Sequence, residues 1–98
     1  MAFEEEIKKV LKEGSVALGI KRVKKNLLRG GVKLVIATSN APQDLKDDAR
    51  YYASLSDAKF YEYPGTSKDL GYVCAKPFPI SFLAVLDDGG SKILDIVK

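Results

Sequence analysis

Lys33-Leu-Val-Ile-Ala37 decides the fold, because the four residues after Lys33 form an unbroken apolar run that contains β-branched residues. A strand with one solvated face alternates between apolar and polar residues, whereas an unbroken run is typical of a strand covered on both faces. Asn40-Ala-Pro42 follows as a turn, and Pro42 is well placed to start a helix that runs to about Leu55. The stretch therefore predicts a buried strand that leads into a covering helix.

Helical spacing of apolar residues indicates three further helices. It predicts a first helix over 3–13, closed by Gly14, and a second over 20–29 with Val23, Leu27 and Leu28 facing the core. A short fourth helix begins after a cap at Thr66 or Ser67 and ends near Gly71 or soon after. On the third helix, which starts at Pro42, one side is shared by Leu45, Ala49, Tyr52 and Ala53.

The remaining segments read as short strands and turns. Strands are predicted over 15–18, 59–63, 80–86 and 92–97, with Lys76-Pro-Phe-Pro79 as a loop and Asp87-Asp-Gly-Gly90 as a hairpin turn. Helices that alternate with short buried strands predict an α/β fold, a three-layer α/β/α sandwich around a small mixed sheet of four or five strands. At 98 residues, the chain should form a single domain over 1–98.

Composition excludes several classes of function. The chain has one cysteine and no histidine. It therefore cannot supply the cysteine and histidine ligands of a zinc site, cannot form an internal disulfide, and has no histidine to act as a general base. No apolar run approaches the roughly 20 residues of a membrane span, and the acidic start resembles neither a signal nor a transit peptide. We therefore expect a small, soluble, intracellular domain that is poor in cofactors.

The charges are strongly segregated along the chain. Between Gly14 and Gln43 there is no acidic residue, but there are six basic ones, although the whole chain has a net charge of only +3. Four of the six lie in the first two turns of the second predicted helix, where the helix dipole already makes cations unfavourable. They are Lys21, Arg22, Lys24 and Lys25, which begin two residues after Gly19.

Such a helix start can bind an anion, because its open N–H groups, the preceding glycine and the cations act together. The natural polyanion is nucleic-acid phosphate, since the chain has no phosphate-binding loop for a nucleoside triphosphate. The alternative is that the run is simply a solvated helix face.

At this point the sequence resembles a known family, the large-subunit ribosomal protein L30e of archaea and eukaryotes, in the L7Ae superfamily of kink-turn RNA-binding proteins. The resemblance covers essentially the whole chain. It is carried by a collinear set of motifs: Gly19-Ile-Lys-Arg-Val-Lys-Lys25, Gly30-Gly-Val-Lys-Leu-Val-Ile-Ala37, Ser39-Asn-Ala-Pro42, Tyr51-Tyr-Ala53, Gly65-Thr-Ser67, Leu70-Gly71 and Leu83-Ala-Val-Leu-Asp87. The resemblance implies an α/β/α fold, no catalysis, and binding to a sharply bent internal loop in ribosomal RNA.

The resemblance also implies which residues bind RNA. In the family, the start of the second helix enters the RNA groove at tandem sheared G·A pairs, and Gly19, Lys21, Arg22 and Lys25 occupy those positions, with Lys24 beside them. The L7Ae branch has Asn-Glu where this chain has Lys21-Arg22, which favours the ribosomal L30e branch. The remaining positions are Asn40, after the central strand, and the loop residues Pro77, Phe78, Pro79 and Ile80.

The residues themselves support two of these roles. A phenylalanine between two prolines in a loop is a stiff platform for stacking unpaired bases, and Asn40 could read a base edge. The alternatives are that Phe78 folds back onto the core and that Asn40 bonds its own turn. Arg50 is more simply explained by an ion pair with Asp47 or another acidic neighbour, and Cys74 by burial as a small apolar residue.

Two other classes of function stay open at this stage. One is a kink-turn-binding module of a non-ribosomal ribonucleoprotein, or a protein that binds its own messenger RNA. The other is a small-ligand or enzyme module that uses the helix start as a phosphate site. The expected partners are ribosomal RNA and neighbouring ribosomal proteins, with no membrane; we expect a cytoplasmic protein that is monomeric when free.

Overall fold

The computed structural model of the protein describes residues 2–87, 89 and 93. In chain order they form α1 (Ala2–Glu13), β1 (Ser15–Leu18), α2 (Ile20–Arg29), β2 (Leu34–Thr38), α3 (Gln43–Leu55), β3 (Lys59–Tyr63), α4 (Ser67–Val73) and β4 (Phe82–Asp87). None of the described helices is long and apolar enough to cross a membrane.

The strands form one mixed sheet in the order β1-β4-β2-β3. β2 pairs with β3 in parallel, and β4 lies antiparallel to both β1 and β2. β2 is buried along its whole length, as the unbroken apolar run predicts, because it is central in the sheet and helices cover both of its faces.

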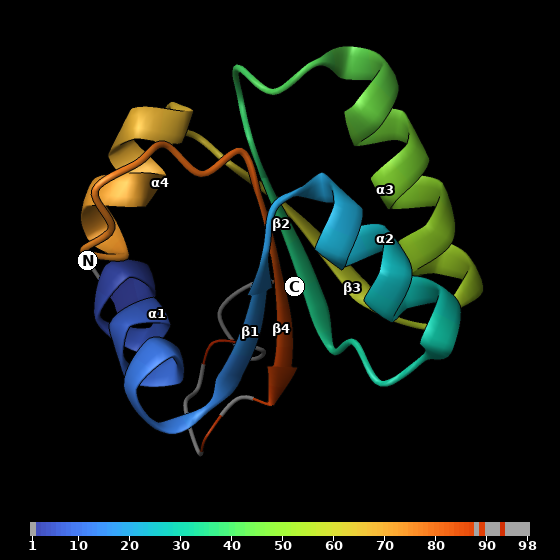
Figure 1. The fold of residues 1–98 in the computed structure, drawn as a ribbon, viewed down its shortest axis with the longest axis horizontal. Coiled ribbons are helices and arrows are strands. Elements are labelled where there is room, and N and C mark those ends of the chain that lie inside the picture. The colour runs from blue at the N-terminus through green and yellow to red at the C-terminus, as the bar shows by residue number, and fades with distance from the viewer. Residues whose placement is uncertain (1, 88, 90–92, 94–98) are drawn as a thin grey trace.

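Two apolar clusters fix the helices on opposite faces of this sheet (Figure 1). On one face, α1 and α4 pack over alternate strand residues such as Leu34 and Ile36. On the other face, α2 and α3 cover the intervening residues, among them Val35 and Ala37. This arrangement confirms the predicted three-layer α/β/α sandwich with a small mixed sheet.

Several details differ from the sequence-based expectation. Leu28 does not face the core, because its side chain is 73% exposed. At 100° per residue it lies well off the stripe that carries Val23 and Leu27, and it continues the row of Lys24 instead. The last strand begins at Phe82 rather than Ile80, since the N–H of Ile80 donates to the carbonyl of Ser67, at the start of α4, and not to a strand.

The predicted hairpin turn at 87–90 and strand at 92–97 lie mostly outside the described residues. Within the turn, the N–H of Gly89 donates to Asp87 Oδ1 at 3.1 Å. Within the predicted strand, Ile93 is described; it is buried, and its backbone is helical rather than extended.

Cys74 follows α4 and is buried in the cluster beneath α1 and α4, as predicted. Burial raises the pKa of its thiol to about 11, and the nearby Lys76 ammonium opposes this shift. The thiol is therefore kept protonated in the fold. We expect alkylation by iodoacetamide near neutral pH to be much slower in the native protein than in denaturant, where the thiolate is accessible.

The same pKa shift predicts a loss of stability in alkali. Because the folded protein holds the thiol proton more tightly than the unfolded chain, the contribution of Cys74 is complete below about pH 8.5 and decreases as the pH rises toward 11. The Cys74→Ala variant should lack this component when unfolding midpoints are compared across that range. Equal alkylation rates in the native and denatured protein would contradict the predicted protection.

Candidate nucleic-acid interface

The residues predicted to bind RNA converge on one edge of the sheet. β1, β2 and β3 end at this edge and β4 begins there, because Leu18 is paired with Leu83, Ala37 with Phe82, and Thr38 with Tyr63. We call it the binding edge. It is built from Gly19, from the turn at 39–42, from 64–67 and from the loop at 76–81, which are far apart in the sequence (Figure 1).

Backbone hydrogen bonds join these segments to one another. The N–H of Gly19 donates to the carbonyl of Phe82 at 3.0 Å, and the N–H of Thr38 donates to that of Ser81 at 3.0 Å. The N–H of Ser39 donates to the carbonyl of Gly65 at 3.2 Å. The binding edge is therefore a connected scaffold rather than a set of independent loops.

Gly19 forms the junction between β1 and α2. Its φ of 90° and ψ of 149° lie in a region that residues with a side chain rarely adopt, so glycine is required here by conformation. It precedes the first turn of α2 without a capping side chain, and that turn contains no acidic residue. The first N–H groups of the helix are consequently available to an outside acceptor.

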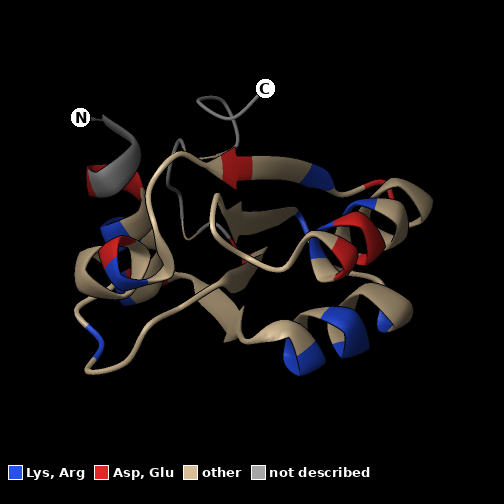
Figure 2. Ribbon diagram, turned by 90° about the horizontal axis from the view of Figure 1, so that it is seen from above, with Lys and Arg blue, Asp and Glu red and all other residues tan. Residues whose placement is uncertain are grey.

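Three of the four predicted cations form an unneutralised cluster at this helix start. Lys21, Arg22 and Lys25 are exposed, and none of them forms an ion pair with a described residue. Lys24 is different, since its Nζ lies 3.3 Å from Asp48 Oδ2 of α3. Figure 2 shows the basic residues gathered along α2, with acidic residues on the neighbouring α3. The structure thus places uncompensated positive charge beside Gly19.

Asn40 is exposed, but its side chain is already oriented by two donors. The Thr38 hydroxyl donates to Asn40 Oδ1 at 2.9 Å, and the N–H of Ser67 donates to the same oxygen at 3.0 Å. Asn40 Nδ2 lies 3.5 Å from Ser67 Oγ, a weak contact at best. The expected local bond within the turn is present, and it leaves the amide N–H groups as the part of Asn40 that can reach a ligand.

Lys46 of α3 supports the binding edge from beneath its turn at 39–42, and the sequence interpretation missed it. It is buried on α3, and its Nζ donates to the carbonyl of Ser39 at 3.1 Å and to Glu62 Oε2 at 3.3 Å. The ammonium thereby fixes the turn that presents Asn40. Its spacing from Ala49 and Ala53, three and seven residues further on, was the available signal that it lies on the buried face of the helix.

Arg50, on the same helix, is engaged within the protein. Its guanidinium lies 3.9 Å from Glu62 Oε1 and stacks over the ring of Phe60, 5.0 Å from the centroid. This arrangement confirms the predicted ion pair between Arg50 and an acidic neighbour, which is Glu62.

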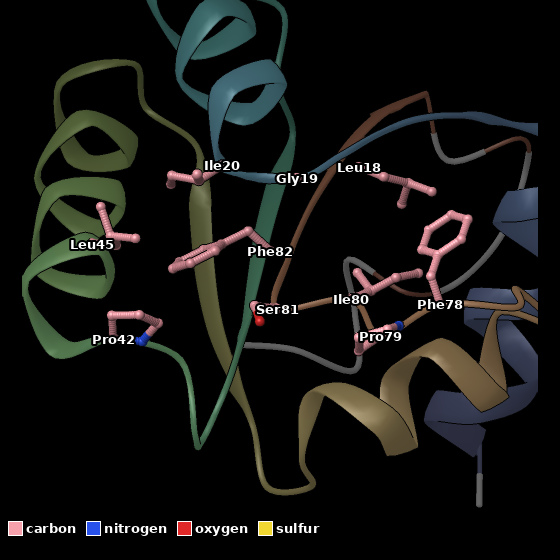
Figure 3. Close-up of a pocket in the computed structure, with 10 residues that line it drawn as sticks. All are labelled: Leu18, Gly19, Ile20, Pro42, Leu45, Phe78, Pro79, Ile80, Ser81 and Phe82. Atoms are coloured by element: carbon pink, nitrogen blue, oxygen red, sulfur yellow. The ribbon is translucent and has the colours of Figure 1, made fainter.

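Phe78 lies in the loop before β4, and its side chain is 49% exposed. It does not fold back completely onto the core. Instead it borders an apolar cavity of about 430 Å³ between the starts of α2 and α3 and this loop. Figure 3 shows Leu18 and Phe78 at one end of the cavity and Ile20, Pro42 and Leu45 at the other.

Pro79 and Ile80, from the predicted set, also line this cavity together with Gly19, whereas the exposed Pro77 lies outside it. The structure therefore brings the loop residues and the helix start to one surface, with Asn40 on the adjoining turn at the same edge.

Comparison with known proteins identifies what the chain resembles. Residues 1–95 match the family described as "Ribosomal protein L7Ae/L30e/S12e/Gadd45 family". The large ribosomal subunit protein eL30 of Saccharolobus solfataricus is 48% identical over 98 residues, which cover 100% of this chain and 91% of that protein. The protein of the same name from Methanocaldococcus jannaschii is 43% identical over 98 residues, 100% of this chain and 89% of its own length.

A solved structure supports the fold. A protein of unknown function from Bacillus halodurans superposes with a TM-score of 0.76 at 20% sequence identity, and the match covers 98% of this chain and 93% of that one. At this identity the likeness shows the α/β/α architecture alone.

Proposed function

The chain belongs to the ribosomal protein L7Ae/L30e/S12e/Gadd45 family, and from this premise we propose that it is an RNA-binding protein of the large ribosomal subunit that recognises and stabilises a kink-turn. Its relatives are named as ribosomal proteins, so it is not an enzyme. Residues 1–98 act as one RNA-binding domain; ribosomal RNA and neighbouring ribosomal proteins in the cytoplasm are its partners, and it is monomeric before assembly.

The observation that carries the proposal is the uncompensated start of α2. Gly19 offers a backbone without a side chain, the first N–H groups of the helix are open, and the exposed Lys21, Arg22 and Lys25 stand beside them. A sharp bend brings phosphates from two strands together, and their mutual repulsion opposes bending. Exposed cations beside a close-fitting helix start would offset this repulsion.

Asn40 and Phe78 supply the contacts that distinguish one loop from another. Two donors hold the Asn40 oxygen inward, so its amide N–H groups face outward toward a base acceptor. The half-exposed ring of Phe78, between Pro77 and Pro79, offers a stacking surface for unpaired nucleotides. Backbone hydrogen bonds between its segments preorganise the binding edge for these roles.

The proposed mechanism is shape selection. A free RNA internal loop populates the kinked form only in part, and a ligand that binds the kinked form better shifts the population toward it. The rigid binding edge contacts the kinked RNA at several places at once, whereas a straight duplex can reach the cations alone.

The deciding experiment compares affinity for a kink-forming RNA with affinity for a straight duplex of equal length and charge. We expect clear preference for the kink-forming RNA. If four or five phosphates are engaged, log affinity should decrease with log salt concentration at a slope of roughly −3 to −4.5. Equal affinities, or a slope near zero in a fluorescence titration, would defeat the proposal.

Asn40→Ala should cost about 1–3 kcal/mol of binding free energy on the kink-forming RNA and little on the duplex, because a base contact is lost but no phosphate contact. The matched control is Asn26→Ala, which removes the other asparagine of the chain, on α2, where its amide bonds the carbonyl of Arg22. Thermal unfolding of both variants should be checked, since Asn40 also accepts from the N–H of Ser67. An equal loss on both RNAs would refute base reading by Asn40.

A further inference from the structure

A second hollow, of about 310 Å³, lies on the other side of Phe78. It is formed between α4 and the loop before β4, and it is lined by Lys68, Tyr72, Lys76, Pro77, Phe78 and Pro79. Of these, Lys68 and Tyr72 lie outside the binding edge, and Lys76 is the first residue of its loop at 76–81 and has been given no role so far.

Tyr72 is the most exposed of the large apolar residues described, at 86%. A helix in this fold could present any polar residue at this position, because the side chain makes no contribution to the core. An aromatic side chain exposed to this extent on a helix, beside a hollow that Phe78 also lines, has the properties of a stacking surface.

Two lysines flank Tyr72 along the chain, four residues before and four residues after it. Lys68 and Lys76 are both exposed, and neither forms an ion pair with a described residue. The nearest acidic residue along α4, Asp69, already accepts the N–H of Thr66 in a capping box at the start of the helix. The hollow is therefore aromatic and cationic at once.

Phe78 connects this hollow with the binding edge. Phe78 and Pro79 line both the cavity beside Gly19 and the hollow beside Tyr72, so the two surfaces adjoin at these residues. A strand that stacks on Phe78 from the first side would reach Tyr72 by continuing across the loop.

We propose that Tyr72, Lys68 and Lys76 form a second RNA-binding site, which takes unpaired nucleotides that continue from the kink across Phe78. This inference rests on the proposed function. Tyr72 stacks with a base, and the two ammonium groups contact the flanking phosphates. A protein neighbour is the other occupant to consider, but lysines are depleted at protein–protein interfaces, and two uncompensated lysines around an aromatic ring fit a polyanion better.

The test uses the full chain and two versions of a kink-forming RNA. One has paired arms only, and the other has an unpaired extension of about six nucleotides, placed on either arm in turn. At one of the two placements the extension should raise the affinity of the wild-type protein about tenfold, and Tyr72→Ala should abolish that gain. Tyr72→Phe should retain it, because the ring is kept.

Tyr51→Ala is the matched control, since Tyr51 is a tyrosine on α3 that is 61% exposed and outside both hollows. The Lys68→Ala, Lys76→Ala double variant should make the salt slope on the extended RNA shallower by about 1.4, because the two lost contacts are to single-stranded phosphates. Unchanged thermal unfolding of Tyr72→Ala will show that the effect is not one of folding.

The inference and the function on which it rests can fail separately. If the wild type does not prefer the kink-forming RNA to the duplex, the proposed function fails. If that preference is present but neither extension raises affinity, or Tyr72→Ala gains as much from the extension as the wild type, the second site is refuted. In that case a protein neighbour would be the remaining candidate to occupy the hollow.

Discussion

Replacing Gly71 with alanine is expected to lower the free energy of unfolding by about 2 kcal/mol and the unfolding temperature by roughly 10 °C. In most helices this substitution stabilises, because alanine is the better helix former by about 1 kcal/mol. Here the sign is reversed, since a Cβ on Gly71 would collide with the backbone carbonyl oxygen of Phe78. A backbone atom held by its loop cannot rotate away as the end of a flexible side chain can.

The Gly71→Ala variant should also bind RNA more weakly, because the loop that must move carries Phe78. The N–H of Lys76 donates to the carbonyl of Gly71 at 3.0 Å, so the loop is attached to the helix at the point of collision. Lys68→Ala, on the exposed side of the same helix, should leave thermal unfolding unchanged. A Gly71→Ala protein as stable as the wild type would mean that the loop can adapt freely.

The Lys21→Ala, Lys25→Ala double variant should lose on the order of a hundredfold in affinity for kink-forming RNA, because two charge-assisted contacts to phosphate disappear. Its salt slope should become shallower by about 1.8. Its stability should rise slightly, since Lys21 lies at the positive end of the α2 dipole and repels Lys25 four residues further on, and neither pairs with a carboxylate among the described residues. Titrations at several salt concentrations, with thermal unfolding of the free protein, measure these quantities.

Lys33→Ala is the control for this double variant. Lys33 belongs to the same acid-free stretch of the sequence, but it precedes β2 and lies at the opposite end of the sheet from the binding edge. If affinity for RNA depends only on the net charge of the protein, each lysine removed will lower the affinity equally in Lys33→Ala and in the double variant. Equal losses would refute a localised site at the start of α2.

Sequence reasoning was most successful where several local signals coincide. The bounds of α2 follow from Gly19 and Gly30, which adopt positive φ at its two ends, and the bounds of β3 from its polar neighbours and the Pro64-Gly65 turn. Thr66 is a cap because its hydroxyl accepts the N–H of Asp69 at 3.3 Å. These features depend on neighbours along the chain, so they are visible in the sequence.

The features that were missed depend on contacts between distant segments. Lys46 is buried because its ammonium finds the carbonyl of Ser39 and the carboxylate of Glu62, an acceptor pair that only the assembled α3 and β3 bring together. Lys24 likewise differs from the other cations in having an ion-pair partner, Asp48, which only the packing of α3 beside α2 brings close. The late start of β4 comes from the bond between Ile80 and α4.

Strand order has a consequence for how the protein is made. Among the described strands β1 pairs only with β4, so the first strand to emerge during translation must wait for the last before it acquires a hydrogen-bonding partner. Contacts of such long sequence separation slow the search for the native state. A nascent chain that stops before Phe82 would leave β1 without its strand partner and the N–H of Gly19 without the carbonyl that accepts its hydrogen bond, so the junction that starts α2 is completed only when β4 has been made.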